Sequence, residues 1–335
     1  MCLYPLRRYV SPSGAVSIVP DSGSPGYVRG VFLDGVEVLD YQIIPCGHCI
    51  ECRLSQSREW ANRMVCEAYY HKASWFLTLT YDNLSVPVSY YPDPDTGEAL
   101  PALTLVKRDC QLFVKRLRKQ LDYYGHSEHI RYYLAGEYGD KTHRPHYHMV
   151  VFGLDFGVLP AEYAPVKLRE SRLGYGYYES SLIDKCWPYG IHILAPANWQ
   201  TCAYVARYVC TKLGGDCKDF YTIHAIEPEF ALMSRKPGLG REYYEQHKHD
   251  IYSHDTLVLS TPDGGMTAKP GRYYDALLEI EDPQLLEQVK ERRLRYAEAA
   301  FAQRRRSTTL SPDEIRAAQA RVFEARSKML VRPDF

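Results

Sequence analysis

The chain has 335 residues, 45% of them hydrophobic and 24% charged, so it can bury one large core or two smaller ones. These values exclude long disorder, collagen-like repeats and coiled-coil rods for most of its length. The 41 basic and 41 acidic residues cancel, so nucleic acid would have to be bound by local basic patches.

No apolar run approaches the roughly 18 residues that a membrane-spanning helix needs, so no membrane association is expected. The N-terminus becomes polar too early for a secretory signal. The ten cysteines are scattered along the chain, unlike the disulfide framework of a small secreted protein. We therefore expect reduced thiols and a cytoplasmic location.

Tyrosine occurs 29 times against 10 phenylalanines, so the fold repeatedly uses a ring that carries a hydroxyl group. One interpretation is half-buried strands whose tyrosine hydroxyls reach water. The other is a set of platforms on which bases of single-stranded nucleic acid stack. The count alone favours the first interpretation.

In chain order, residues 1–45 read as short strands separated by turns, and a cysteine-rich segment follows. Cys46, Cys49 and Cys52 are separated by two residues each, which suits a structural zinc site with Cys66, His48 or Cys2 as a fourth ligand. The alternative is a set of small, half-buried residues at the beginning of a helix.

Beyond the cysteines, the pattern predicts a helix over 52–71, a buried strand over 75–80 and a surface excursion over 85–101. An amphipathic helix is predicted over 107–121. Its apolar stripe consists of Phe113, Val114, Leu117 and Leu121. Its other face is basic and is a candidate for contacts with phosphates, as is a basic helical segment over 290–332.

A predicted hairpin joins strands 130–137 and 146–152 and brings three possible metal ligands together. Side chains alternate along a strand, so His146 and His148 share one face. Glu137, at the end of the preceding strand, would lie beside them. Two imidazoles and one carboxylate leave open positions on an ion, as a catalytic site requires. The alternative for Glu137 is an exposed acid at a strand end.

Residues 153–200 read as an insertion rich in Gly, Tyr and Pro with short strands, and a helix is predicted over 199–213. Tyr204, Tyr208 and Lys212 are spaced four residues apart and form one line along this helix. Taken alone, two such tyrosines are better explained by an amphipathic helix with tyrosines at the border of an apolar interface. The composition loosens after residue 215, which suggests a domain edge.

Taken together, the strand at 76–80, Glu137, the His146-x-His148 motif and the Tyr204-x-x-x-Tyr208-x-x-x-Lys212 helix resemble the HUH endonuclease superfamily. Within that superfamily, the chain looks like the replication initiation proteins of the Microviridae, gokushovirus type, and Pro45–Arg53 resembles their cysteine-rich segment. The similarity covers roughly residues 45–215. Tyr147 stands where an aliphatic residue is more common in the histidine motif.

The resemblance implies that His146, His148 and Glu137 bind a divalent cation, Mg²⁺ or Mn²⁺. It also implies that Tyr204 and Tyr208 are paired nucleophiles and that Lys212 assists them. The expected activity is site-specific nicking and joining of single-stranded DNA through a 5′-phosphotyrosine intermediate, which initiates rolling-circle replication of a phage genome.

The expected partners are single-stranded DNA at the replication origin and a helicase and polymerase of the host, in the cytoplasm of a bacterium. Two alternatives stay open. One is a related HUH relaxase or transposase. The other is a zinc-bearing DNA-binding or scaffold protein without catalysis, in which Tyr204 and Tyr208 only pack.

The expected fold is α+β, with a central antiparallel sheet and flanking helices in a ferredoxin-like arrangement, plus a helical C-terminal extension. We expect residues 1–60 to hold the N-terminal strands and the cysteine-rich segment. The endonuclease core would occupy 61–215. Residues 216–335 would form the partly helical, basic extension.

Overall fold

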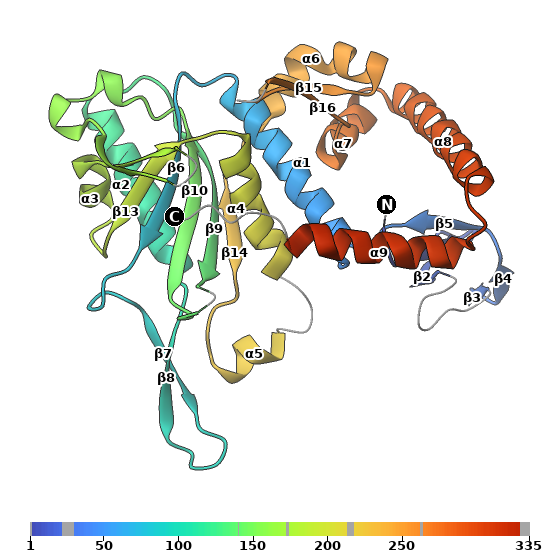
Figure 1. The fold of residues 1–335 in the computed structure, drawn as a ribbon, viewed down its shortest axis with the longest axis horizontal. Helices are drawn as coiled ribbons and strands as arrows, with labels where there is room; N and C mark the ends of the chain where they lie inside the picture. The colour runs from blue at the N-terminus through green and yellow to red at the C-terminus, as the bar shows by residue number, and fades with distance from the viewer. Residues whose placement is uncertain are drawn as a thin grey trace. The chain divides into compact units, whose positions relative to one another are not determined.

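The strand expected at 75–80 lies inside a seven-stranded sheet of the computed structural model, which confirms the α+β class (Figure 1). All neighbouring strands of the sheet pair antiparallel. In spatial order the strands are β11 (Val166–Glu170), β12 (Gly176–Glu179), β13 (His192–Pro196), β6 (Ser74–Thr80), β10 (Pro145–Phe152), β9 (Arg131–Tyr138) and β14 (Phe230–Met233). The structure describes residues 2–21, 30–139, 141–171, 174–212, 218–261 and 264–328.

Four of these strands have the ferredoxin-like arrangement. The chain runs through β6, helix α2 (Lys107–Tyr123), β9, β10, helix α3 (Ser181–Cys186) and β13. In space the order is β13-β6-β10-β9, so the first and third strands of this series are neighbours in the middle. β10, which carries the two histidines, therefore has a hydrogen-bonded partner along each of its edges.

The two faces of the sheet belong to different apolar cores. Leu77 of β6 and Met149 of β10 pack with α2 and α3. Phe76 and Val150, their neighbours in sequence, point the other way and pack with α1 (Ile50–Ala68) and α4 (Trp199–Lys212). The apolar stripe predicted for 107–121 is confirmed, since its four members are buried in the first core.

Two segments differ from the expectations. The excursion at 85–101 forms a hairpin of β7 (Val88–Pro92) and β8 (Ala99–Leu103), which extends away from the sheet (Figure 1). The segment expected to be an insertion has the expected short strands, β11, β12 and β13, but these continue the main sheet beyond β6. Their pairing depends on partners far away in sequence, so local composition did not reveal it.

By contacts between residues, the chain divides into two compact units, Met1–Gln56 with Lys290–Val331, and Ser57–Val289. The expected domain edge at 215–216 lies outside the described residues.

The first unit contains a sheet of β1 (Leu6–Val10), β2 (Val16–Pro20) and β5 (Tyr41–Ile44), and a pair formed by β3 (Val31–Leu33) and β4 (Val36–Val38). The expected short strands in 1–45 are thus confirmed.

The second unit adds a third core cluster, built on α1, α6 and α7. The remaining elements of the chain are η1 (Phe156–Val158), η2 (Ala161–Tyr163), α5 (Lys218–Ile223), α6 (Arg241–His254), β15 (Leu257–Thr261), β16 (Gly264–Ala268), α7 (Arg272–Glu281), α8 (Pro283–Arg306) and α9 (Pro312–Lys328). Among the described residues, no helix is both long enough and apolar enough to cross a membrane.

Tyr147 gives a test of the fold that is independent of any activity. It lies between the two histidines but points to the α2 side, where its hydroxyl accepts a hydrogen bond from the Val106 amide at 2.9 Å and contacts the Tyr81 hydroxyl at 2.9 Å. Tyr147→Phe leaves that amide without its acceptor, so we expect the free energy of unfolding to fall by about 1–3 kcal/mol. Chemical denaturation measures this loss.

The matched control is Tyr123→Phe on α2, where the side chain is 79% exposed. We expect its free energy of unfolding to stay within about 0.5 kcal/mol of the original. Equal losses in the two variants would contradict the assigned role of the Tyr147 hydroxyl.

Candidate active site

The three predicted ligands meet where β9 and β10 pair. The register sets Glu137 directly opposite His146, and His148 follows two residues along the same face. The Nε2 atoms of His146 and His148 each lie 2.8 Å from Oε1 of Glu137. One ligand atom from each residue lies within 4.8 Å of the others, so the group has the dimensions of a metal site. The predicted hairpin is thereby confirmed.

Hydrogen bonds behind the imidazoles fix which nitrogen faces this point. Nδ1 of His146 lies 3.1 Å from the carbonyl oxygen of Arg144, which can only accept, so Nδ1 carries the proton. Nδ1 of His148 lies 3.0 Å from the hydroxyl of Thr78 on β6. Each Nε2 thereby faces Oε1 of Glu137 and donates to it when it carries a proton, and a bound cation would take the place of that proton, as in metal-binding histidines whose second nitrogen is held by a hydrogen bond.

Glu137 is a buried carboxylate with one oxygen unsatisfied. Its side chain is 1% exposed, and Oε2 has no hydrogen-bond partner among the described residues. Burial by itself raises the pKa of Glu137, but the hydrogen bonds and charge of His146 and His148 outweigh it, so the pKa is lowered. The acid is therefore ionised and is available as a ligand, in contrast to the exposed strand-end acid of the alternative.

A divalent cation fits this donor set. Ligands at about 2.1 Å from an octahedral ion lie about 3 Å from their neighbours, which is close to the 2.8 Å seen here. If the carboxylate bound the ion through both oxygens, the ion would also satisfy Oε2 of Glu137. With three protein ligands, further positions stay open for oxygen atoms of a substrate.

Tyr204 reaches this point from α4, on the same face of the sheet. Its hydroxyl lies 3.4 Å from Nε2 of His148, and its ring packs edge-on against His148 and Phe76. The side chain is 6% exposed, so the phenol is held in place by the core. The expected helix is present as Trp199–Lys212, but the side chains of Tyr208 and Lys212 lie outside the described part of the structure.

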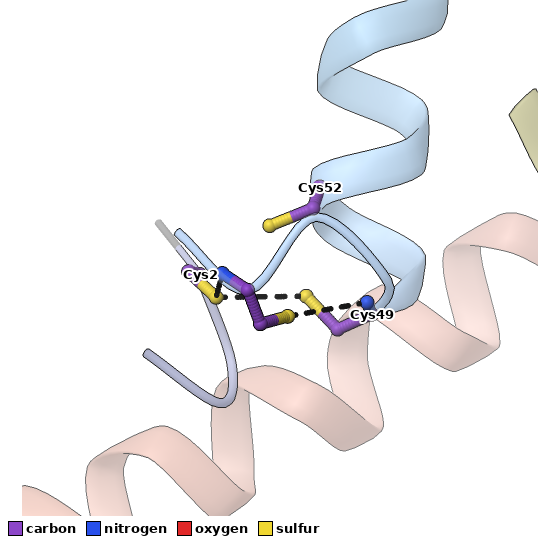
Figure 2. A group of neighbouring side chains, drawn as sticks. Cys2, Cys49 and Cys52 are labelled. Carbon is purple, nitrogen blue, oxygen red and sulfur yellow. Dashed lines mark hydrogen bonds between the residues drawn. The ribbon is translucent and has the colours of Figure 1, made fainter. Parts of the chain in front are cut away.

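The cysteines form a second group in the other unit. The sulfur atoms of Cys2, Cys46, Cys49 and Cys52 lie within 4.8 Å of one another, and Figure 2 shows the thiols of Cys2, Cys49 and Cys52 directed toward a common point. Of the three candidates for a fourth ligand, Cys2 is the one in the group. Cys66 is instead buried in the third core cluster.

Sequence reasoning missed Thr78, which orients His148. It was seen only as part of a β-rich strand, and its role depends on the register in which β6 pairs with β10. No local pattern indicates that register.

The basic face of α2 lies away from the histidines, because α2 covers the opposite face of the sheet. Several of its charges also have partners within the chain. Lys107 pairs with Glu227, and Arg118 donates to the carbonyl of Ile130 at 3.1 Å. Any phosphate contact by α2 would therefore lie away from Glu137, His146 and His148.

The family model and the relatives that match this chain are all replication-associated proteins. Residues 74–213 match the family model of ORF2-type replication-associated proteins. The chain is 31% identical to the replication-associated protein ORF2 of Spiroplasma virus 4 over 293 residues. These residues cover 87% of this chain and 85% of that protein.

Two further relatives are similar over shorter stretches. The replication-associated protein VP4 of Bdellovibrio phage phiMH2K is 32% identical over 241 residues, which cover 69% of this chain and 66% of that protein. The replication-associated protein ORF4 of Chlamydia phage 1 is 32% identical over 222 residues, 65% of this chain and 50% of that protein. No solved structure matches the chain.

Glu137→Gln tests the donor set directly. The amide keeps the shape of the side chain but loses the negative charge, so we expect Mn²⁺ affinity to fall at least tenfold. Titration calorimetry with Mn²⁺ measures it. Glu245→Gln, at an exposed carboxylate of α6, serves as the control and keeps the original affinity. Equal affinity in the two variants would remove Glu137 from the site.

Thr78→Val tests the orientation of His148. The variant keeps the shape of the side chain and removes the oxygen at Nδ1, so we expect Mn²⁺ affinity to fall 10–100-fold. The control is Thr80→Val, two residues along the same strand face, whose hydroxyl donates to the carbonyl of Ile191. A loss of affinity in Thr80→Val as large as that in Thr78→Val would count against a specific role for Thr78.

Proposed function

This chain belongs to the family of phage replication-associated proteins, and from that membership we propose that it nicks and rejoins single-stranded DNA to initiate rolling-circle replication of a phage genome. The observation that carries the proposal is the 3.4 Å contact between the Tyr204 hydroxyl and His148, at the point where Glu137 and His146 converge. The Tyr204 hydroxyl and a cation held by Glu137, His146 and His148 would thus be close enough to act on the same phosphodiester.

A phosphodiester is anionic and repels nucleophiles, so the site must offset its charge. His146, His148 and Glu137 would hold a divalent cation, Mg²⁺ or Mn²⁺, which when bound polarises the scissile phosphate. The side chain of His146 is 22% exposed, against 2% for His148, so DNA would approach from the His146 side. Arg144 and Thr78 would keep both imidazoles oriented through the reaction.

The proposed step transfers one phosphoryl group. The Tyr204 oxygen bonds to phosphorus while the bond from phosphorus to the 3′ oxygen breaks, and the phenol proton ends on that oxygen. The products are a 5′-phosphotyrosine and a free 3′-OH. The phosphotyrosine retains the energy of the cleaved linkage, so a 3′-OH can reverse the reaction and rejoin the strand without a nucleotide cofactor.

Two tyrosines would allow this step to occur twice per replication cycle. Tyr208 follows Tyr204 by four residues on α4, one turn along the same line of the helix. One phenol would hold the parental 5′ end while the other cuts the regenerated origin. Lys212, one further turn along, would offset phosphate charge or favour the ionised phenol.

The expected partners follow from the products. The free 3′-OH is a primer for a polymerase of the host. The sequence contains no Gly-x-x-x-x-Gly-Lys-Ser/Thr phosphate loop, so strand separation would come from a host helicase. We place this activity in the cytoplasm of the infected bacterium.

The test uses Mn²⁺ and short single-stranded oligonucleotides that tile the phage genome. For the oligonucleotide that spans the origin, a 3′ label should move with the protein on denaturing gels. A 5′ label should appear on a shortened strand that a polymerase can extend. We expect each single variant, Tyr204→Phe and Tyr208→Phe, to retain one round of cleavage. The double variant should lose at least about 1,000-fold of the adduct, because no nucleophile remains.

Tyr243→Phe is the matched control, a buried tyrosine on helix α6 in a different core cluster, and it should cleave normally. An adduct that survives the double variant would contradict the nucleophile assignment. Binding of the origin oligonucleotide without any cleavage, in the presence of Mn²⁺, would favour a binding protein instead.

A further inference from the structure

We propose that Cys2, Cys46, Cys49 and Cys52 form a closed, four-thiolate zinc site that holds the first unit together. The four residues come from three segments of the chain. Cys2 precedes β1, Cys46 follows β5, and Cys49 and Cys52 lie at the beginning of α1. This inference does not depend on the nicking activity, since none of these thiols belongs to the Glu137 group.

The spacing of the sulfur atoms fits one tetrahedral ion. Zinc–thiolate bonds of about 2.3 Å place ligand sulfurs about 3.8 Å apart. Sγ of Cys2 lies 3.9 Å from Sγ of Cys49, and all four sulfurs are within 4.8 Å of one another. A disulfide would require about 2.05 Å. An iron–sulfur cluster would spread its thiolates over several iron atoms and hold them further apart.

The backbone around the sulfurs is arranged to stabilise thiolates. The amide of Cys46 donates to Sγ of Cys2 at 3.2 Å, and the amide of Cys49 donates to Sγ of Cys46 at 3.3 Å. Gly47, between them, has φ +78°, a conformation that a side chain would strain, and it lets the chain turn back around the sulfurs. The N-terminal end of α1 adds a favourable dipole for negative charge.

The first unit also needs such a link. All three apolar core clusters found among the described residues consist of residues from Ser57–Val289, so the first unit has no such cluster of its own there. Its buried apolar side chains include Leu3 and Tyr9, but many of its apolar residues are exposed: Val10, Val16, Ile18, Phe32, Val36, Leu39 and Ile43. Small units without a sufficient core commonly depend on a structural metal.

The ion would join the beginning of β1 to the end of β5, two strands that already pair antiparallel with Leu6 opposite Ile44. It would also fix both strands to the first turn of α1. A site with four protein ligands has no open position, so its role is structural and not catalytic. The unit would fold with the metal and lose order without it.

The test measures metal in the full chain, purified under reducing conditions with any tag at the C-terminal end and without metal-chelate chromatography. Inductively coupled plasma mass spectrometry should find about one zinc per chain after dialysis against a mild chelator. Cys49→Ser should lose this zinc. Cys2→Ser removes another of the four ligands and should lose this zinc as well.

Three controls separate this site from other sources of zinc. His48→Ala, within the same segment, and Cys66→Ser, in α1 but outside the group, should both retain zinc. The double variant His146→Ala with His148→Ala should also retain it, which excludes the other metal centre. Absence of zinc in the original chain, iron in its place, or zinc retained by Cys49→Ser would overturn the proposal.

A second measurement needs no variant. Titration of the metal-free original chain with Co²⁺ should give the strong thiolate-to-cobalt absorption of a tetrahedral sulfur site, and Zn²⁺ should displace it. Limited proteolysis should then cleave residues 1–56 faster in the metal-free chain than in the zinc-loaded chain. Cobalt spectra without thiolate absorption would contradict the proposal even if the cysteine variants failed to fold.

Discussion

The pairing register of β9 and β10 positions the side chains that define the candidate active site. It places a buried carboxylate, Glu137, directly opposite His146 and beside His148. A shift of one residue would turn Glu137 to the α2 side and separate it from both imidazoles. Burying an unpaired carboxylate costs several kcal/mol, so the contact between these three side chains and the register of the strands stabilise each other.

Successive side chains of β10 point to opposite faces of the sheet, and the two faces have different roles. His146 and His148 face α4, and Tyr147 and Met149 face α2. The apolar side, completed by residues such as Leu77 of β6, contributes packing and fixes the position of the strand. The polar side can then hold three ionisable groups close together, because β6 and β9 satisfy both edges of the strand. Tyr204 is held against His148 by the same packing.

The two groups of metal-binding side chains differ in what supports them. Glu137, His146 and His148 are set on the central strands of a well-packed sheet, and three ligands leave positions open. Cys2 and its three partners lie in a unit without a described apolar core, and four thiolates leave none open. The packed sheet holds Glu137, His146 and His148 in place. For the cysteines we infer the reverse, that the bound zinc stabilises the fold of the first unit.

Features that depend on local spacing could be predicted from the sequence. Examples are the shared face of His146 and His148, the amphipathic helix over 107–121 and the spacing of the cysteines. Each of these patterns involves residues that are close together in sequence. Three further features became evident from the folded chain: Thr78 supports His148, Cys2 joins the other cysteines, and residues 166–196 extend the main sheet. These facts depend on the pairing of segments distant in sequence. Such pairing follows from the packing of the whole chain, and no short-range pattern encodes it.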